Sequence, residues 1–220
     1  MNLPVPGNPD KVQPDSFAFD ATSEVEIAKA LARYPAERKA SAVMPMLYIA
    51  QDQMGRLTGS AWIPVVAMDE IARRLEIAPI RVYEVASFYF MYNRNPIGTY
   101  HLQVCTTTSC WLRGPDDVVA ACKKATGISN FGETSADGKF TLTEVECPGA
   151  CSNAPILQVD NDFYEDLDGP RTEALIEALR RGERPEPGPT IDRCGSAPEG
   201  GRRTLLEDAV AGAGIPQGQG

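Results

Sequence analysis

Apolar side chains recur at helical spacing along the first part of the chain. Ile27, Leu31 and Tyr34 stand four and then three residues apart, which places them on one face of a helix. Ser23 precedes this face and is followed by acidic residues, so we expect it to cap the helix. A second apolar face with similar spacing follows over residues 43–54. The chain therefore begins its periodic part with two amphipathic helices.

Proline and glycine mark the ends of these helices and of two more. Pro45 belongs in the first turn of the second helix or kinks it, and Gly55 is its expected stop. Pro64 and Pro79 suit the first positions of a third and a fourth helix. We expect a four-helix bundle with short connections. The inward-facing positions after the first helix are Val43, Leu47, Ala50, Met54, Met68, Ile71, Leu75, Val82, Val85 and Tyr89.

The pattern changes from helices to strands after a cluster of Asn, Pro and Gly at residues 93–98. Alternation over residues 100–105 predicts a strand, and the run from Gly114 to Asp117 predicts a helix start. The order β-α-β-β-β-α predicts an α+β fold, with two helices on a small, mostly antiparallel sheet. The later elements are expected as strands near 140–145, 155–159 and 163–164, a turn at Asn161-Asp162, and a helix from Gly169 to a stop at Gly182.

These patterns divide the chain into four segments. Residues 1–20 are polar and aperiodic and form an N-terminal tail, and residues 21–95 form the helical bundle domain. Residues 96–182 form the α+β domain. Residues 183–220 form a tail rich in Gly and Pro, which alone should be disordered or should lie extended on a partner.

Composition narrows the function classes. The chain is 43% apolar and carries a formal net charge of −9, and an acidic surface repels phosphate backbones, which argues against nucleic-acid binding. It contains no apolar run long enough to span a bilayer. The first 20 residues resemble neither a secretory signal nor an Arg-rich transit peptide. We therefore expect a reducing compartment, where paired cysteines favour metal or redox chemistry over disulfides.

Four of the six cysteines form two close pairs at the ends of expected strands. Cys105 and Cys110 are spaced C-x4-C, and Cys147 and Cys151 are spaced C-x3-C. A [2Fe–2S] cluster needs two thiolates at each iron, which two such pairs supply when the fold brings them together. Structural zinc sites favour C-x2-C pairs. The spacing therefore favours an iron–sulfur cluster, with a zinc site and thiol chemistry as the alternatives.

A cluster with four thiolates is anionic and needs hydrogen-bond donors around its sulfurs. Gly114, Gly149 and the hydroxyl-rich stretch 106–109 allow N–H and O–H groups to turn toward them. Cys122 lies on an apolar helix face, where we expect a core thiol, and Cys194 in the tail is expected to be an unused thiol. No glycine-rich phosphate loop lies between a strand and a helix, so the chain has no visible nucleotide site of its own.

Three motifs together resemble those of the 24 kDa iron–sulfur subunit of respiratory complex I, the NADH:quinone oxidoreductase. They are Cys105-x4-Cys110-x3-Gly114, the run from Thr141 through Cys147-x-Gly149-x-Cys151 to Ala154-Pro155, and the run from Val82 to Tyr89. The resemblance covers about residues 20–182 and continues into residues 193–201. Pro148 departs from it, because a bulkier apolar residue is expected there.

The resemblance implies a helical bundle followed by a thioredoxin-like [2Fe–2S] domain with Cys105, Cys110, Cys147 and Cys151 as ligands. It implies docking against the flavoprotein subunit that binds NADH and FMN, and against the large iron–sulfur subunit of the peripheral arm. The chain would exchange single electrons with that flavin and hold no complete active site. It would reach the membrane only through the complex, on the cytoplasmic side in a bacterium or the matrix side in a mitochondrion.

Three other functions are compatible with the same residues. An equivalent subunit serves NAD-linked hydrogenases and formate dehydrogenases, and the long C-terminal extension favours the respiratory complex over these. A zinc-stabilised structural adaptor would keep the fold without redox chemistry. A free ferredoxin would not need the helical segment and the tail.

Overall fold

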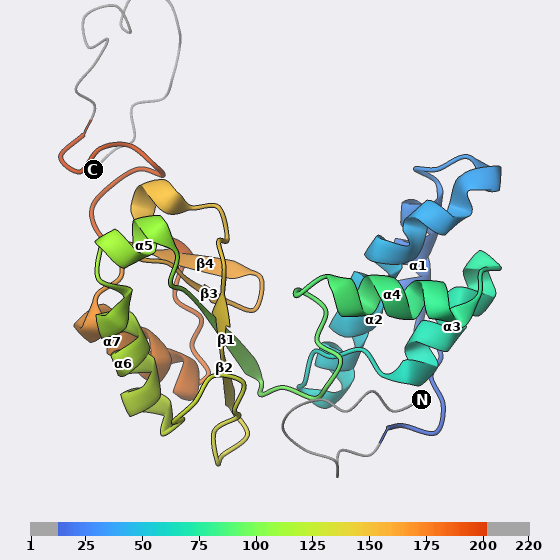
Figure 1. Ribbon diagram of the computed structural model, residues 1–220, viewed down its shortest axis with the longest axis horizontal. Helices are drawn as coiled ribbons and strands as arrows, with labels where there is room; N and C mark the ends of the chain where they lie inside the picture. The colour runs from blue at the N-terminus through green and yellow to red at the C-terminus, as the bar shows by residue number, and fades with distance from the viewer. Residues whose placement is uncertain (1–12, 202–220) are drawn as a thin grey trace, which may run out of the picture. The chain divides into compact units, whose positions relative to one another are not determined.

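The computed structural model describes residues 13–201 of the chain. Two compact units can be distinguished by their internal contacts. One comprises the chain up to Leu102 together with Lys123–Thr143, and the other comprises Gln103–Cys122 together with the chain from Glu144 onward. Figure 1 shows the helices and strands of both. The four segments expected from the sequence, with boundaries after residues 20, 95 and 182, stay a prediction.

All four expected N-terminal helices are present. They are α1 (Ala21–Leu31), α2 (Val43–Thr58), α3 (Val65–Leu75) and α4 (Pro79–Phe88). Pro45 lies in the first turn of α2, where its missing N–H costs no helical hydrogen bond. A short 3-10 helix, η1 (Ala36–Ala42), leads into α2 and was not expected from the periodicity.

Two of the predicted helix ends are wrong. Asp20, rather than Ser23, caps α1, because the Ser23 N–H donates to Asp20 Oδ1 at 2.7 Å. Gly55 lies inside α2, and the helix ends at Gly59, whose φ of 73° is left-handed. A Cβ on Gly55 would lie 3.2 Å from the Ala61 Cβ, so this glycine serves close packing rather than helix termination.

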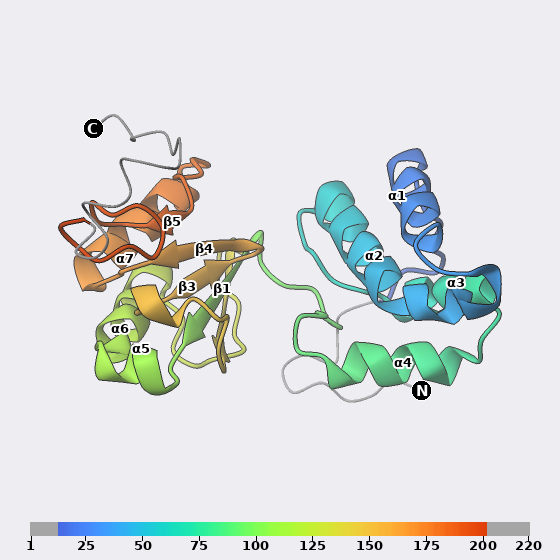
Figure 2. The same cartoon turned by 90° about the horizontal axis from the view of Figure 1, so that it is seen from above.

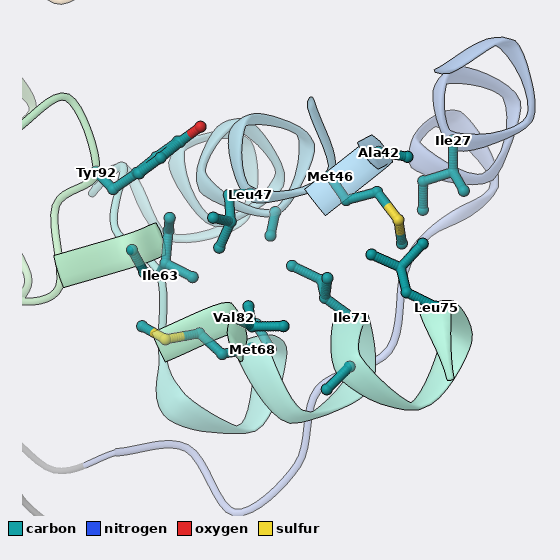
Figure 3. Packing of buried hydrophobic residues seen from close by; sticks show 14 of the residues in the cluster. Ile27, Ala42, Met46, Leu47, Ile63, Met68, Ile71, Leu75, Val82 and Tyr92 are labelled. Atoms are coloured by element: carbon teal, nitrogen blue, oxygen red, sulfur yellow. The ribbon is translucent and has the colours of Figure 1, made fainter. Parts of the chain in front are cut away.

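One apolar core joins the four helices (Figure 3). Its side chains come from the helix faces that the periodicity predicts, and burying each large one stabilises the fold by about 1.5–3 kcal/mol. Residues 13–20 contain no helix or strand, yet Phe19 is buried in the same core and Arg74 lies over its ring. The labelled core residues are Ile27, Ala42, Met46, Leu47, Ile63, Met68, Ile71, Leu75, Val82 and Tyr92.

The second half of the chain forms a five-stranded sheet in the order β2-β1-β3-β4-β5 (Figures 1 and 2). The strands β3 and β4 pair antiparallel and β4 and β5 pair in parallel, so the sheet is mixed. The expected order β-α-β-β-β-α is found, with α5, η2 and β5 added. The bounds are β1 Tyr100–Cys105, α5 Thr108–Leu112, α6 Pro115–Thr126, β2 Phe140–Val145, η2 Cys151–Asn153, β3 Leu157–Val159, β4 Asp162–Glu165, α7 Gly169–Arg180 and β5 Gly188–Pro189.

The strand β1 is buried along its whole length, although its sequence alternates. It lies between β2 and β3, so it is a central strand with both faces covered. His101, expected to alternate out of the strand, is therefore buried, and its Nε2 lies 2.9 Å from Thr143 Oγ1. Burial lowers the pKa of His101 to about 4.

Residues 183–201 are ordered on the sheet, contrary to the expectation that the tail has no structure of its own. The short strand β5 pairs with β4, and the Thr190 N–H donates to the Glu165 carbonyl at 3.0 Å. Residues 1–12 and 202–220, the outer parts of the two expected tails, lie outside the described residues. Within residues 13–201, no helix has both the length and the apolar character that crossing a membrane requires.

Candidate metal centre

The four paired cysteines stand on elements of the second compact unit. Cys105 ends β1, and Cys110 lies in α5, which follows directly. Cys147 lies in the loop after β2, and Cys151 begins η2. The Sγ atoms of Cys147 and Cys151 are 3.3 Å apart. The predicted pairs therefore sit on two loops that follow two neighbouring strands.

The two pairs differ in their exposure. Cys105 and Cys110 are buried in a small apolar cluster with Ala154 and Ile156. Cys147 and Cys151 are exposed. One half of the site is thus closed to water by packing, while the other half faces the surface.

Interactions between the thiols link both pairs. The Cys105 thiol interacts with Cys110 of its own pair and with both Cys147 and Cys151 of the other. Cys110 also interacts electrostatically with Cys151. The fold therefore brings all four sequence-predicted residues into one cluster of sulfur atoms.

The protein environment separates the acidities of these thiols. Burial, followed by the bond with Cys105, raises the pKa of Cys110 to about 12. The bond from Cys151 and the Gly149 N–H lower the pKa of Cys147, and the same bond raises the pKa of Cys151. A bound metal deprotonates its thiol ligands, so the acidity of the free thiols sets how readily metal binds rather than their charge afterwards.

Hydrogen-bond donors surround the sulfurs. The Gly149 N–H, where φ is 97°, is directed at Cys147 and the Ile156 N–H at Cys110. The hydroxyls of Thr107 and Ser109 add donors at Cys147 and Cys151. Ile156 could not be found from the sequence pattern, because the fold rather than local spacing brings β3 to Cys110.

Gly114, also expected to help, does not donate to a sulfur. Its N–H donates to the Trp111 carbonyl at 3.4 Å and so closes the end of α5. Its φ of 84° explains why glycine stands there. The donors at this site therefore come from the second cysteine loop and from β3, together with the 106–109 stretch.

This arrangement fits a binuclear cluster. Across the part of the chain that is described, no three or more His, Cys, Asp and Glu side chains are placed to hold a metal ion. A [2Fe–2S] cluster asks for two thiolates at each iron, which two linked cysteine pairs supply. The donors toward the sulfurs match the negative charge that such a cluster carries.

The other two cysteines stand apart from this chemistry. Cys122 is fully buried in the middle of α6, and burial raises its pKa to about 12, as for a core thiol. Cys194 is exposed in the C-terminal tail. Both placements match what the sequence predicts for them.

Comparison with solved structures identifies the fold. An NAD⁺-reducing [NiFe]-hydrogenase in the air-oxidised state aligns with 62% of this chain at a TM-score of 0.51 and 21% identity. This chain covers 23% of that hydrogenase chain, so the likeness concerns the fold alone.

Comparison by sequence identifies the family. Residues 27–180 match the family profile of thioredoxin-like [2Fe–2S] ferredoxins. The NuoE-type NADH-quinone oxidoreductase protein of Rickettsia prowazekii is 47% identical over 167 residues, which cover 76% of this chain and 91% of that protein. The mitochondrial NADH dehydrogenase [ubiquinone] flavoprotein 2 of Dictyostelium discoideum is 45% identical over 87% of this chain and 76% of its own length. The chain therefore belongs to the NuoE family of NADH-quinone oxidoreductase subunits, whose core is a thioredoxin-like [2Fe–2S] ferredoxin.

Proposed function

We propose that this chain is the NuoE-type electron-transfer subunit of an NADH:quinone oxidoreductase and that Cys105, Cys110, Cys147 and Cys151 bind its [2Fe–2S] cluster. The observation that carries the ligand assignment is the convergence of two cysteine pairs from separate loops. When bound, the cluster takes up and releases one electron at a time.

The residues around the thiols suit this role. Burial of Cys105 and Cys110 beside Ala154 and Ile156 keeps water from one side of the site. The N–H groups of Ile156 and Gly149 stabilise negative charge on the sulfurs, which favours the reduced state and raises the reduction potential. The exposed pair leaves the other side open to a redox partner.

The partner that we propose is the flavoprotein subunit that binds NADH and FMN, with the large iron–sulfur subunit of the peripheral arm beside it. Trp111 and Leu112 support a docked partner, because they directly follow Cys110 and are 66% and 71% exposed. Large exposed apolar side chains beside a redox site are typical of a protein interface. The flavin would then exchange single electrons with the site from across this surface.

The place of action follows from the same proposal. Relatives of this chain include bacterial and mitochondrial proteins. We place the chain in the peripheral arm, on the cytoplasmic side of the inner membrane in a bacterium or on the matrix side in a mitochondrion. Contact with the membrane would be made by other subunits of the complex.

Metal analysis and electron paramagnetic resonance of the anaerobically purified full chain test the ligand assignment. We expect iron and acid-labile sulfide in equal amounts and a signal in the reduced state. Cys147→Ser should lose or alter the signal, whereas Cys194→Ser should leave it unchanged, because Cys194 lies outside both pairs. An unchanged signal in Cys147→Ser would refute the assignment, and zinc without iron would favour a structural adaptor.

A further inference from the structure

The described part of the C-terminal tail is fastened to the loop that carries the exposed cysteines. Asn153 is buried at the end of η2, two positions after Cys151. Its Oδ1 accepts a hydrogen bond from Arg193 Nη1 at 2.9 Å. Its Nδ2 donates to the Gly195 carbonyl at 2.9 Å and to the Glu165 carboxylate. One side-chain amide thus joins the cysteine loop to the tail and to β4.

Arg193 is held in turn by Asp166. Arg193 Nη2 lies 2.8 Å from Asp166 Oδ1, and the two side chains are only 11% and 3% exposed. The Asp166 N–H donates to the Asn153 carbonyl at 2.7 Å, and the Thr190 hydroxyl donates to the Asp166 carbonyl at 3.0 Å. Removing one partner of a buried ion pair is strongly destabilising. The arginine, the amide and the end of β4 therefore fix one another.

The exposed cysteine pair lies between two such anchored points. On the side of Cys147, the carbonyl of Glu146 accepts a hydrogen bond from Thr107 Oγ1 at 2.7 Å. On the side of Cys151, the anchored residue is Asn153. Because both thiols are exposed, packing contributes little to their position. The anchors at the two ends must supply most of it.

We infer that the Arg193–Asp166 ion pair, acting through Asn153, is a positioning device that holds Cys151 where it completes the set of cluster ligands. The inference rests on the ligand assignment proposed above. Arg193 makes no contact with a sulfur that the structure records, so its effect passes through the amide of Asn153. Residues that orient metal ligands in this indirect way change metal affinity by about 10- to 100-fold when they are mutated.

The full chain with its cluster offers a matched set of variants. Arg193→Gln removes the charge, and Arg193→Lys keeps the charge but loses the two-pronged geometry. Arg184→Gln is the control, because Arg184 lies in the same tail and pairs with Asp160 and Asp162 instead. We expect Arg193→Gln to release iron to a chelator about tenfold faster and to alter the electron paramagnetic resonance signal. Arg193→Lys should recover part of both effects, and Arg184→Gln should match the unmodified chain.

A second variant separates positioning from general stability. Asn153→Ala leaves the ion pair but cuts its link to the cysteine loop. If Arg193 acts through Asn153, the double variant should release iron no faster than the more affected single variant. Additive effects, or an unmodified rate and spectrum in Arg193→Gln, would overturn the inference. Should Arg193→Gln not fold, an unmodified rate and spectrum in Asn153→Ala would overturn it instead.

The ligand assignment itself has a separate readout in the same assay. Cys151→Ser keeps Arg193, Asp166 and Asn153 and is expected to lose the unmodified signal. A Cys151→Ser chain with an unmodified signal would refute the assignment whatever Arg193→Gln does. A changed signal in Cys151→Ser together with an unmodified one in Arg193→Gln would overturn only the positioning role.

Discussion

The thiol of Cys105 donates a hydrogen bond to the carbonyl oxygen of Glu146, with 3.0 Å between Sγ and oxygen. The bond ties the end of β1 to the residue that precedes Cys147, so it connects the two cysteine loops directly. Thr107 Oγ1 donates to the same oxygen at 2.7 Å. Because a thiolate has no proton to donate, Thr107 becomes the donor that this carbonyl retains once Cys105 binds iron.

Thr107→Val should therefore weaken the cluster-bound chain more than the cluster-free chain. Loss of one hydrogen bond costs the cluster-free chain about 1 kcal/mol of unfolding free energy, measured in urea. In the bound chain the carbonyl would lose the Thr107 donor in addition to that of Cys105, and iron release should be several-fold faster. Thr108→Val is the control, since Thr108 is exposed. Equal behaviour of the two variants would contradict the role given to Thr107.

Gly98 is expected to tolerate no side chain. A Cβ at this position would lie 2.7 Å from backbone atoms of Phe140, closer than nonbonded atoms approach, so β2 would have to move. Gly98→Ala should destabilise the fold by about 1–3 kcal/mol, as overpacking does, in a urea titration. Gly169→Ala is the matched control, because its Cβ would lie 3.7 Å from the nearest atom, the Asp117 carbonyl oxygen. A stable Gly98→Ala would mean that β2 does not lie this close to residue 98.

His101 should make stability depend on pH. Its pKa is about 4 in the folded chain and 6.5 unperturbed, so the unfolded chain binds the proton more tightly. Folding is therefore favoured above pH 6.5 and loses stability as the pH falls from there toward 4. Between about pH 7.5 and about pH 5 the loss should be about 2 kcal/mol. His101→Gln should flatten the curve in this window, and an unchanged pH dependence in that variant would assign it to other groups.

Trp111 should contribute to docking without contributing to the cluster. Trp111→Glu puts a charge on a surface that is 66% exposed in the chain alone, so folding and the electron paramagnetic resonance signal should be unchanged. Association with the flavoprotein subunit should weaken by about tenfold or more, as for an aromatic residue at an interface centre. Titration of one purified subunit with the other measures this. Leu57→Glu, an exposed apolar position in α2, is the control. Equal affinity of the two variants would place the interface elsewhere.

Hydrophobic periodicity predicted most of the elements because each element buries one face. The apolar faces of α2 and α3 place Leu47, Met68 and Ile71 in the core as expected. Helix ends were less predictable, because Asp20 and Ser23 are both good caps and only the structure shows which one donates and which accepts. The expected half-exposed strand at His101 was wrong because alternation cannot report that a strand is central.

The site was predictable as far as it lies in short motifs. The spacing of the cysteines and the glycine at position 149 are local signals, and the fold brings these residues together. Ile156 and Arg193 carry no local signal. The first reaches Cys110 through the pairing of strands, and the second reaches Asn153 through a tail that is 40 residues away in sequence. Contacts of this kind depend on the whole topology.

The pairing of Gly188 and Pro189 with β4 also has a consequence for how copies of the chain behave toward one another. An outermost strand with unpaired N–H and carbonyl groups is a template on which a second molecule can add its own strand. Here the chain covers the margin of β4 itself, and the covering strand contains a proline, which has no N–H to offer a further neighbour. The segment after α7 thereby protects the sheet against strand-to-strand self-association.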